Sequence, residues 1–402
     1  MKRQFVWVAG GRILAAVLQA AILVVLARST DPATFGFFSA VFGIGVVLQN
    51  AFDLGLGTYV VRERANEPHS GKISMALHIN NATSIAMGTF SILVLFCLSI
   101  ATPLTLWVFI PLAVAMAAER NADVRLGVAL ADGDARVNTL NLVGRRTGTI
   151  LVFVVLVLST DAEPVLAYCL AAAIAGLVSV ATAHRYVRRH VDPVVPRAGW
   201  HETLTASWPF YVNSFATQFR NLDTTLVAAF AGPAQGGLYA AAARLTGPLR
   251  ILPTSLAAVL LPNATRANDV SVRRRSLGLT LYVVLVMTLI YVVLAVIVPW
   301  GIPVVLGQSY SASIPAVQIV LVGLVFAAGS SLLSASLQGW GDAPYVGTVA
   351  ATTSALCLVS VSIGAAVGGA TMAGAGLALS FLVQALGLSF RLPRHLRTTK
   401  NP

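Results

Sequence analysis

The sequence carries few charges. Charged residues make up 10% of its 402 residues, whereas apolar residues make up 57%. Soluble domains have about 25% charged and about 45–50% apolar residues, because their surfaces must interact with water. This composition excludes a water-soluble globular protein, and we expect most of the surface to face lipid.

Cysteine is also scarce. The three cysteines stand far apart within apolar runs, and their spacing matches neither a metal site nor a disulfide framework. We interpret them as small buried hydrophobic residues. We therefore expect no metal site and no cofactor.

Long apolar stretches, by contrast, recur along the whole chain. A helix needs about 17–25 mostly apolar residues to cross a bilayer. Stretches of this kind lie at 6–27, 36–58, 75–100, 104–120, 138–159, 164–184, 204–230, 237–261, 277–299, 312–337, 343–366 and 370–391. They predict an all-α polytopic membrane protein with about twelve transmembrane helices. The fourth and fifth stretches are the least regular, because charged residues crowd their shared end: Glu119, Arg120, Asp123, Arg125, Arg145 and Arg146.

Basic residues indicate which connections face the cytoplasm. One set of connections carries nearly all the arginines and lysines outside the predicted spans, and the opposite set carries only Arg28. This predicts a multi-pass protein of the bacterial inner (cytoplasmic) membrane with both termini in the cytoplasm. The same topology explains the net charge of +12. We therefore expect membrane lipids, and no nucleic acid, as partners of the basic loops.

The chain repeats itself at its midpoint. DPATFGFFSA at 31–40 is echoed by GPAQGGLYAA at 232–241, and Gly-Asp-Ala occurs both at 133–135 and at 341–343. An even number of spans separates each pair, which predicts a parallel internal repeat. We expect an N-terminal six-helix bundle (1–190), a cytoplasmic linker (191–201) and a C-terminal six-helix bundle (202–402). Two such pseudo-repeated bundles around a central cleft form an architecture suited to transport.

Polar side chains inside the predicted spans indicate where to look for function. An arginine or aspartate at the centre of a transmembrane helix costs about 2.5–3.5 kcal/mol on insertion scales, so it usually faces the protein interior or water. In the seventh span, four polar residues follow helical spacing and form one stripe: Asn213, Thr217, Arg220 and Thr224. Asp223 lies three residues after Arg220, within reach of an ion pair.

The first and eighth spans add further polar residues. Arg12 and Gln19 form a fainter stripe in the first span, and an offset of 201 residues superimposes them on Asn213 and Arg220 of the seventh. The eighth span contributes Arg244 and Arg250, and the prolines at 248 and 253 predict a bend there.

Arginines outnumber aspartates at membrane depth. The arginines are Arg12, Arg220, Arg244 and Arg250, and the aspartates are Asp53 and Asp223. This excess favours an anionic ligand, and phosphate or pyrophosphate matches the guanidinium fork. We predict the substrate-binding residues Arg12, Gln19, Asn213, Thr217, Arg220, Arg244 and Arg250. Three structural alternatives stay open: an Arg220–Asp223 ion pair, Arg12 reaching the membrane interface, and Asp53 capping a helix.

Several segments resemble a known family. Residues 35–40, 53–58 and 62–63 are similar to the opening signature of polysaccharide flippases, which belong to the multidrug/oligosaccharidyl-lipid/polysaccharide exporter superfamily. Residues 237–239 and 244–245, together with Asp223, resemble the second half of that family. The likeness extends over the whole chain at the level of topology.

This resemblance implies a MATE-like fold with two lobes and alternating access. The cargo would be an anionic lipid-linked glycan, an oligosaccharide on polyprenyl pyrophosphate, moved from the inner to the outer leaflet. The pyrophosphate would meet Arg12, Arg220, Arg244 and Arg250. Asp53 and Asp223 are candidates for coupling to H+ or Na+.

Three other functions are alternatives to a polysaccharide flippase. A multidrug/cation antiporter of the same fold should have acidic groups in its cleft, and a transporter of unrelated fold is a further alternative. A membrane glycosyltransferase or polymerase needs an acid, base or metal beside the membrane. The predicted outer loops hold no histidine, and their carboxylates apart from Asp31 are Asp161 and Glu163, in a turn. We therefore predict a transporter, and no enzyme.

Overall fold

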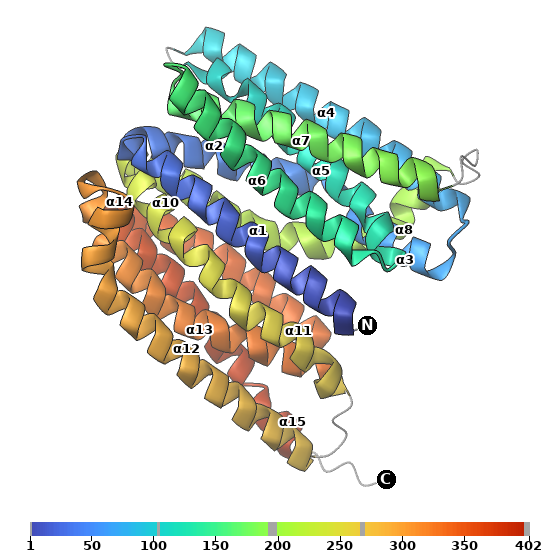
Figure 1. The fold of residues 1–402 in the computed structure, drawn as a ribbon. Coiled ribbons are helices and arrows are strands. Elements are labelled where there is room, and N and C mark those ends of the chain that lie inside the picture. Colours follow the sequence, from blue (N-terminus) through green and yellow to red (C-terminus); the bar gives the residue numbers. More distant parts are fainter. Residues whose placement is uncertain (1, 103–104, 192–198, 266–269, 398–402) are drawn as a thin grey trace. The chain divides into compact units, whose positions relative to one another are not determined.

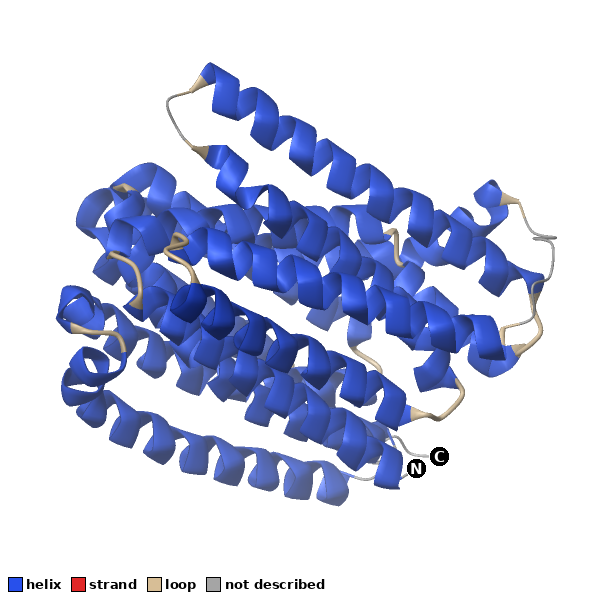
Figure 2. Cartoon of the chain, turned by 45° about the horizontal axis from the view of Figure 1, so that its top comes forward, coloured by secondary structure: helices blue, strands red, loops and turns tan. Residues whose placement is uncertain are grey.

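Helices account for nearly all of the described chain. The computed structural model describes residues 2–102, 105–191, 199–265 and 270–397. Across these ranges the chain forms α-helices and short 3-10 helices joined by turns, without β-strands (Figure 2). The predicted all-α fold class is confirmed.

The chain divides into two compact units (Figure 1). Unit 1 comprises Met1–Ile22 and Val41–Gln218, and unit 2 comprises Leu23–Ala40 and Phe219–Pro402. Two helices, α1 (Lys2–Arg28) and α2 (Pro32–Asp53), pass from one unit to the other. The predicted boundaries of the internal repeat, at 190 and 202, stay a prediction.

Unit 1 is built around α5. Its elements beyond α1 and α2 are α3 (Leu56–Asn66), α4 (Gly71–Ala101), a 3-10 turn (Leu106–Phe109), α5 (Ile110–Ala131), α6 (Ala135–Ser159), α7 (Pro164–His190) and α8 (Trp200–Gln218). α5 packs against α3, α4, α6 and α7. Its many buried alanines allow close approach, and Gly176 of α7 lies directly against Ala115 and Ala118.

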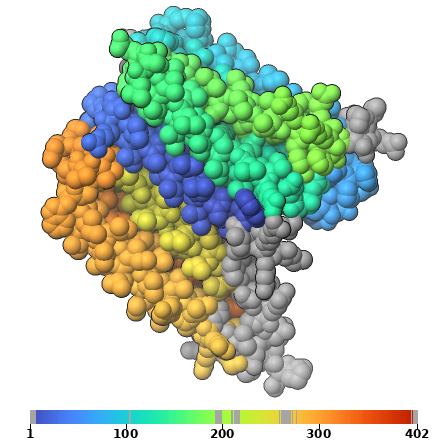
Figure 3. Space-filling view, in the orientation of Figure 1, coloured from blue at the N-terminus to red at the C-terminus, as the bar shows by residue number. Residues whose placement is uncertain are grey.

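Unit 2 is built around α13 in the same way. Its elements are α9 (Asp223–Ala231), α10 (Pro233–Thr246), α11 (Ile251–Thr265), α12 (Val270–Val305), α13 (Ile314–Gly339), α14 (Ala343–Ser389) and α15 (Leu392–Arg397), with 3-10 turns at Phe219–Leu222, Gly247–Arg250 and Gln308–Ser313. α13 packs against α10, α11, α12 and α14. α12 runs along the surface in Figure 3, and its exposed Leu281, Leu285 and Trp300 are typical of a lipid-facing helix.

α14 is two antiparallel helices joined at a glycine pair. Gly368 and Gly369 leave the helical conformation, and Gly369 has a φ of +62°. The Ser360 hydroxyl donates to the carbonyl of Gly376 at 2.9 Å, which ties one half to the other. These halves correspond to the eleventh and twelfth predicted spans.

Eight helices in the described residues are long and apolar enough to cross a membrane. This number counts α14 once and omits three regions that were predicted as spans. α5 carries several charges, and the seventh and eighth predicted spans are each divided by a 3-10 turn, at Phe219–Leu222 and Gly247–Arg250. The turn at 247–250 begins next to Pro248, where the sequence predicted a bend.

Within unit 2, α2 and α10 contact each other at two glycines that the sequence repeat relates. A Cβ placed on Gly36 of α2 would overlap the carbonyl oxygen of Pro233, and one placed on Gly237 of α10 would overlap that of Pro32. Both pairs of residues are related by the offset of 201, so the contact is reciprocal. Only glycine permits two helix backbones to approach this closely.

The Gly-Asp-Ala segments also form equivalent turns. Gly133 after α5 and Gly341 after α13 have φ angles of +83° and +96°. The amides of Asp134 and Asp342 donate to carbonyls five residues earlier, at 2.8 and 2.9 Å. The central helices of both units therefore end in the same left-handed cap.

Candidate functional site

Two predicted arginines of unit 2 converge on one aromatic ring. The guanidinium carbon of Arg220 lies 5.0 Å from the ring centroid of Phe381, and that of Arg250 lies 5.1 Å from it. Phe381 is buried, with 1% of its surface exposed. The ring face attracts both cations without neutralising them.

Broken helices position this arginine pair. Arg220 lies in the 3-10 turn Phe219–Leu222, between α8 and α9, and Arg250 ends the turn Gly247–Arg250, between α10 and α11. The prolines of the eighth span remove backbone donors and favour the break. Discontinuous helices of this kind supply ligand sites in membrane transporters.

Arg220 and Arg250 retain unused hydrogen-bonding capacity. Arg220 donates from Nη2 to the Thr353 carbonyl at 3.4 Å, whereas its buried Nε atom has no partner among the described residues. Within the same part of the chain, neither arginine forms an ion pair. Two adjacent cations without a paired carboxylate are arranged to bind an anion.

Asp223 is held by other partners. One carboxylate oxygen accepts from the Tyr239 hydroxyl at 2.9 Å, and the other accepts from the backbone amide of Thr224 at 2.6 Å. The continuous stripe predicted for the seventh span is interrupted as well, because the 3-10 turn changes the spacing between residues 217 and 224. Asp223 thus organises the start of α9, and the buried Tyr239 is its partner on α10.

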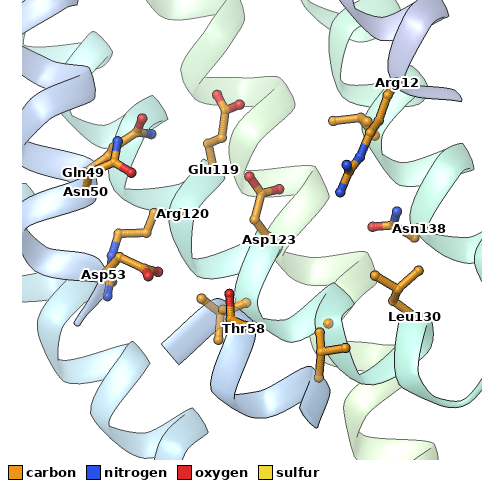
Figure 4. Close-up of a pocket in the computed structure, with 15 residues that line it drawn as sticks. Arg12, Gln49, Asn50, Asp53, Thr58, Glu119, Arg120, Asp123, Leu130 and Asn138 are labelled. Atoms are coloured by element: carbon orange, nitrogen blue, oxygen red, sulfur yellow. The ribbon is translucent and has the colours of Figure 1, made fainter. Parts of the chain in front are cut away.

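Unit 1 contains a polar cavity of about 600 Å3 (Figure 4). Residues from α1, α2, α3, α5 and α6 line it: Arg12, Gln49, Asn50, Asp53, Gly57, Thr58, Val61, Glu119, Arg120, Asp123, Val124, Gly127, Leu130, Asn138 and Leu142. Figure 4 shows Arg12, Glu119 and Asp123 facing the same space. This cavity is large enough for a small molecule.

Charges around the unit 1 cavity form fixed pairs. The buried Arg145 of α6 contacts the carboxylates of both Glu119 and Asp123 at 3.0 Å. Arg146 contacts Glu119 at 2.5 Å. The side chain of Arg145 is 2% exposed, so removing its partners would leave an isolated buried charge.

Arg120 also has a structural role, because its hydrogen bonds join three helices. It donates to the carbonyls of Phe52 and Asn80 and to the hydroxyls of Thr83 and Ser84. These bonds join α2, α4 and α5 at the depth where α2 ends. Arg120 therefore fixes one wall of the cavity.

The structure places the predicted site residues in different surroundings. Arg12 and Asp53 line the unit 1 cavity, and the Asp53 carboxylate also accepts from the Gly55 amide at 3.1 Å. Gln19 lies elsewhere in unit 1, where its amide donates to the Tyr168 hydroxyl at 3.3 Å. Arg244 is half-buried on α10.

Two predicted residues, Asn213 and Thr217, lie on α8, and their side chains are outside the described part of the structure. Glu119, Asp123 and Arg145 were not predicted as site residues. The signal that could have found them is the crowding of opposite charges at the shared end of the fourth and fifth spans.

Comparison with known proteins identifies the fold. Residues 135–268, about a third of the chain, match the sequence model of a family described as polysaccharide biosynthesis protein. An inward-facing multidrug resistance MATE family transporter of the MOP superfamily has a TM-score of 0.78 and 15% identity, over 97% of this chain and 96% of its own. The outward-facing conformation of such a transporter gives 0.71 and 16%, over 99% and 97%.

A third similar structure is a MOP superfamily transporter from Pyrococcus furiosus, with a TM-score of 0.67 and 15% identity over 99% of this chain and 97% of that one. No curated protein matches the chain in sequence. Identities this low establish the fold alone. The chain therefore has the fold of the multi-pass MATE-type membrane transporters, and the predicted resemblance to a polysaccharide-related family is confirmed over residues 135–268.

Proposed function

We propose that this protein moves a lipid-linked oligosaccharide on polyprenyl pyrophosphate from the inner to the outer leaflet by alternating access. Arg220 and Arg250 bind the pyrophosphate, and Arg12 and Arg244 attract it. Gln19, Asn213 and Thr217 are proposed as accessory substrate contacts. The single observation that carries this proposal is the pair of arginines around Phe381, which have no ion pair within the described residues.

The polarity of this pair argues against export of cations. Two guanidinium groups beside one ring repel a cationic drug, and the nearby carboxylate of Asp223, which accepts from Tyr239 and Thr224, balances only one of the two positive charges. The transporter from Pyrococcus furiosus is described as having a binding pocket of reverse polarity that suggests a different function. A similar departure from cation export fits the chain described here.

The proposed transport cycle includes no group transfer, because the lipid-linked sugar is bound and released with every covalent bond intact. The protein is proposed to lie in the bacterial inner membrane with both termini in the cytoplasm. Asp53 and Asp223 are proposed as the groups that would bind H+ or Na+ if transport is coupled to an ion gradient.

A flipping assay tests the function. Purified protein is reconstituted in vesicles with a polyprenyl-pyrophosphate oligosaccharide bearing a fluorescent tag, and a membrane-impermeant quencher reports the leaflet of the tag. We expect flipping by the wild type, and a decrease of about tenfold or more in Arg220→Ala and in Arg250→Ala, because each loses a charge-assisted contact.

Arg273→Ala is the matched control for the flipping assay. Arg273 also lies over an aromatic ring, 5.6 Å from the centroid of Trp340, but in the first turn of α12. It should flip at the wild-type rate. Wild-type flipping in both Arg220→Ala and Arg250→Ala would remove these residues from the site, and no flipping by the wild type would reject the function.

A further inference from the structure

The unit 1 cavity differs chemically from the arginine pair. Its volume of about 600 Å3 is within the usual range for small-molecule sites. Arg12, Thr58 and Asp123 line it and are exposed, so the cavity is accessible to a ligand. Of the four arginines proposed to meet the pyrophosphate, Arg12 lines this space, whereas Arg220 and Arg250, which are proposed to bind it directly, belong to unit 2.

An anion is a poor ligand for this cavity. The carboxylates of Asp53, Glu119 and Asp123 line it beside Arg12 and Arg120, so positive and negative charges offset one another and the wall offers a phosphate no pair of unopposed cations. Glu119 and Asp123 are held in place by Arg145, so they cannot turn away without leaving a buried charge unpaired. The ligand is therefore neutral or carries its charge elsewhere.

Neutral polar groups of the cavity have hydrogen-bonding capacity to spare. Gln49 donates its amide to the Met116 carbonyl at 2.8 Å, and Asn50 donates to the Val46 carbonyl at 2.8 Å, which leaves both side-chain oxygens as acceptors. Asn138 and Thr58 line the cavity from α6 and α3, and both are without a side-chain hydrogen-bond partner in the described ranges. Each of these two can donate and accept.

Asp123 adds a charged acceptor. Its carboxylate contacts Arg145 through one oxygen, and its side chain is 52% exposed. Figure 4 shows this carboxylate and Asn138 on different helices around the same space, with the Arg12 side chain extending between them. Hydrogen-bond donors and acceptors therefore both line the cavity.

We propose that this cavity binds sugar hydroxyl groups, with Asn138, Thr58 and Asp123 as direct hydrogen-bond partners of a neutral glycan. A hydroxyl group both donates and accepts, so it is the ligand chemistry that satisfies a wall of mixed donors and acceptors. The inference rests on the proposed function, and assigns the sugar portion of the substrate to unit 1.

Saturation-transfer NMR on the full-length protein in nanodiscs tests the assignment. The probe is a mixture of uncharged di- to tetrasaccharides of glucose, galactose and N-acetylglucosamine. We expect saturation transfer from the wild type, and binding about fivefold weaker in Asn138→Leu and in Thr58→Val, since each loses one neutral hydrogen bond. Arg250→Ala should bind these sugars as the wild type does.

Asn141→Leu is the control on the same helix. Asn141 faces α7, donating to Ser179 and Thr182, and lines a separate groove. It should leave sugar binding unchanged. A wild type that gives no saturation transfer, or cavity variants that bind the sugars normally, would overturn the assignment.

Binding of inorganic pyrophosphate by the same samples separates the two proposals. Pyrophosphate binding without sugar binding would overturn only the sugar assignment and leave the anion site standing. Sugar binding that depends on Asn138, with no pyrophosphate binding, would support the cavity assignment and contradict the proposed headgroup site.

Discussion

The candidate sites of the two units differ in how their arginines are paired. In unit 1, Arg145 is buried and contacts two carboxylates, and Arg120 donates hydrogen bonds to backbone carbonyls and side-chain hydroxyls. In unit 2, Arg220 and Arg250 stand beside the ring of Phe381 without an ion pair in the described chain. The Gly-Asp-Ala turns are equivalent in the two units, but the pairing of these arginines with carboxylates is not. We infer the ligand from the arginines that have no carboxylate partner, and not from the repeated backbone.

Removing Arg145 should have the largest effect on stability. Arg145→Met leaves Glu119 without one cation and Asp123 without its close partner, and breaking a buried pair in this way costs about 3–5 kcal/mol. We expect a marked loss of thermal stability in detergent, followed by intrinsic fluorescence. Adding Asp123→Asn to this variant should restore part of the loss, because Asp123 is the carboxylate left without its partner. An unchanged unfolding temperature in Arg145→Met would show that unit 1 does not depend on this network.

The second-largest loss of stability should follow from substitutions at the reciprocal glycine contact. Gly36→Ala and Gly237→Ala each place a Cβ against a backbone carbonyl, and overpacking of this kind costs about 1–3 kcal/mol. Because the contact is reciprocal, the two variants should lose similar stability. Gly347→Ala is the control, since a Cβ there meets nothing within 4 Å. Equal stability of all three variants would show that the repeats do not meet as described.

The smallest expected loss of stability comes from removing the N-terminal cap of α2, which α10 lacks. Asp31 caps α2, accepting from the Ala33 amide at 2.8 Å, whereas the equivalent position before α10 is Gly232, which has no side chain. Asp31→Ala should cost about 1 kcal/mol at neutral pH. Thermal unfolding of both proteins measures this difference.

The pH dependence of that effect has a definite sign. The Thr34 hydroxyl donates to Asp31 and lowers the pKa of its carboxyl below the ordinary value. The contribution of the charged carboxylate is therefore present above a pH of about 4 and is lost as the pH falls through the lowered value. The gap between wild type and Asp31→Ala should narrow in acid. A gap that stays constant would contradict the cap.

Much of the fold could be predicted from the sequence. The lengths of the apolar stretches predicted the long helices. The break between the last two predicted spans coincides with the non-helical Gly368 and Gly369. The bend near Pro248 followed from the missing backbone donor of proline. These features depend on local composition, which a sequence displays directly.

The site was harder to predict for physical reasons. Arg220 and Arg250 were selected because charge at membrane depth is costly, but their meeting at Phe381 depends on packing between segments more than 100 residues apart. The helical spacing of the seventh span assumed a continuous helix, and a 3-10 turn interrupts it. Crowded charges near Glu119 predicted neither pairs nor a cavity, because spacing along one helix does not determine partners on the next.

The most direct measurement of the central claim is the affinity of the purified protein for inorganic pyrophosphate, by isothermal titration calorimetry, in the wild type and in Arg220→Ala/Arg250→Ala. We predict measurable binding by the wild type, and binding at least about tenfold weaker in the double variant, with thermal stability retained. Equal affinity in the two proteins would contradict the claim that these unmatched arginines bind the anionic headgroup.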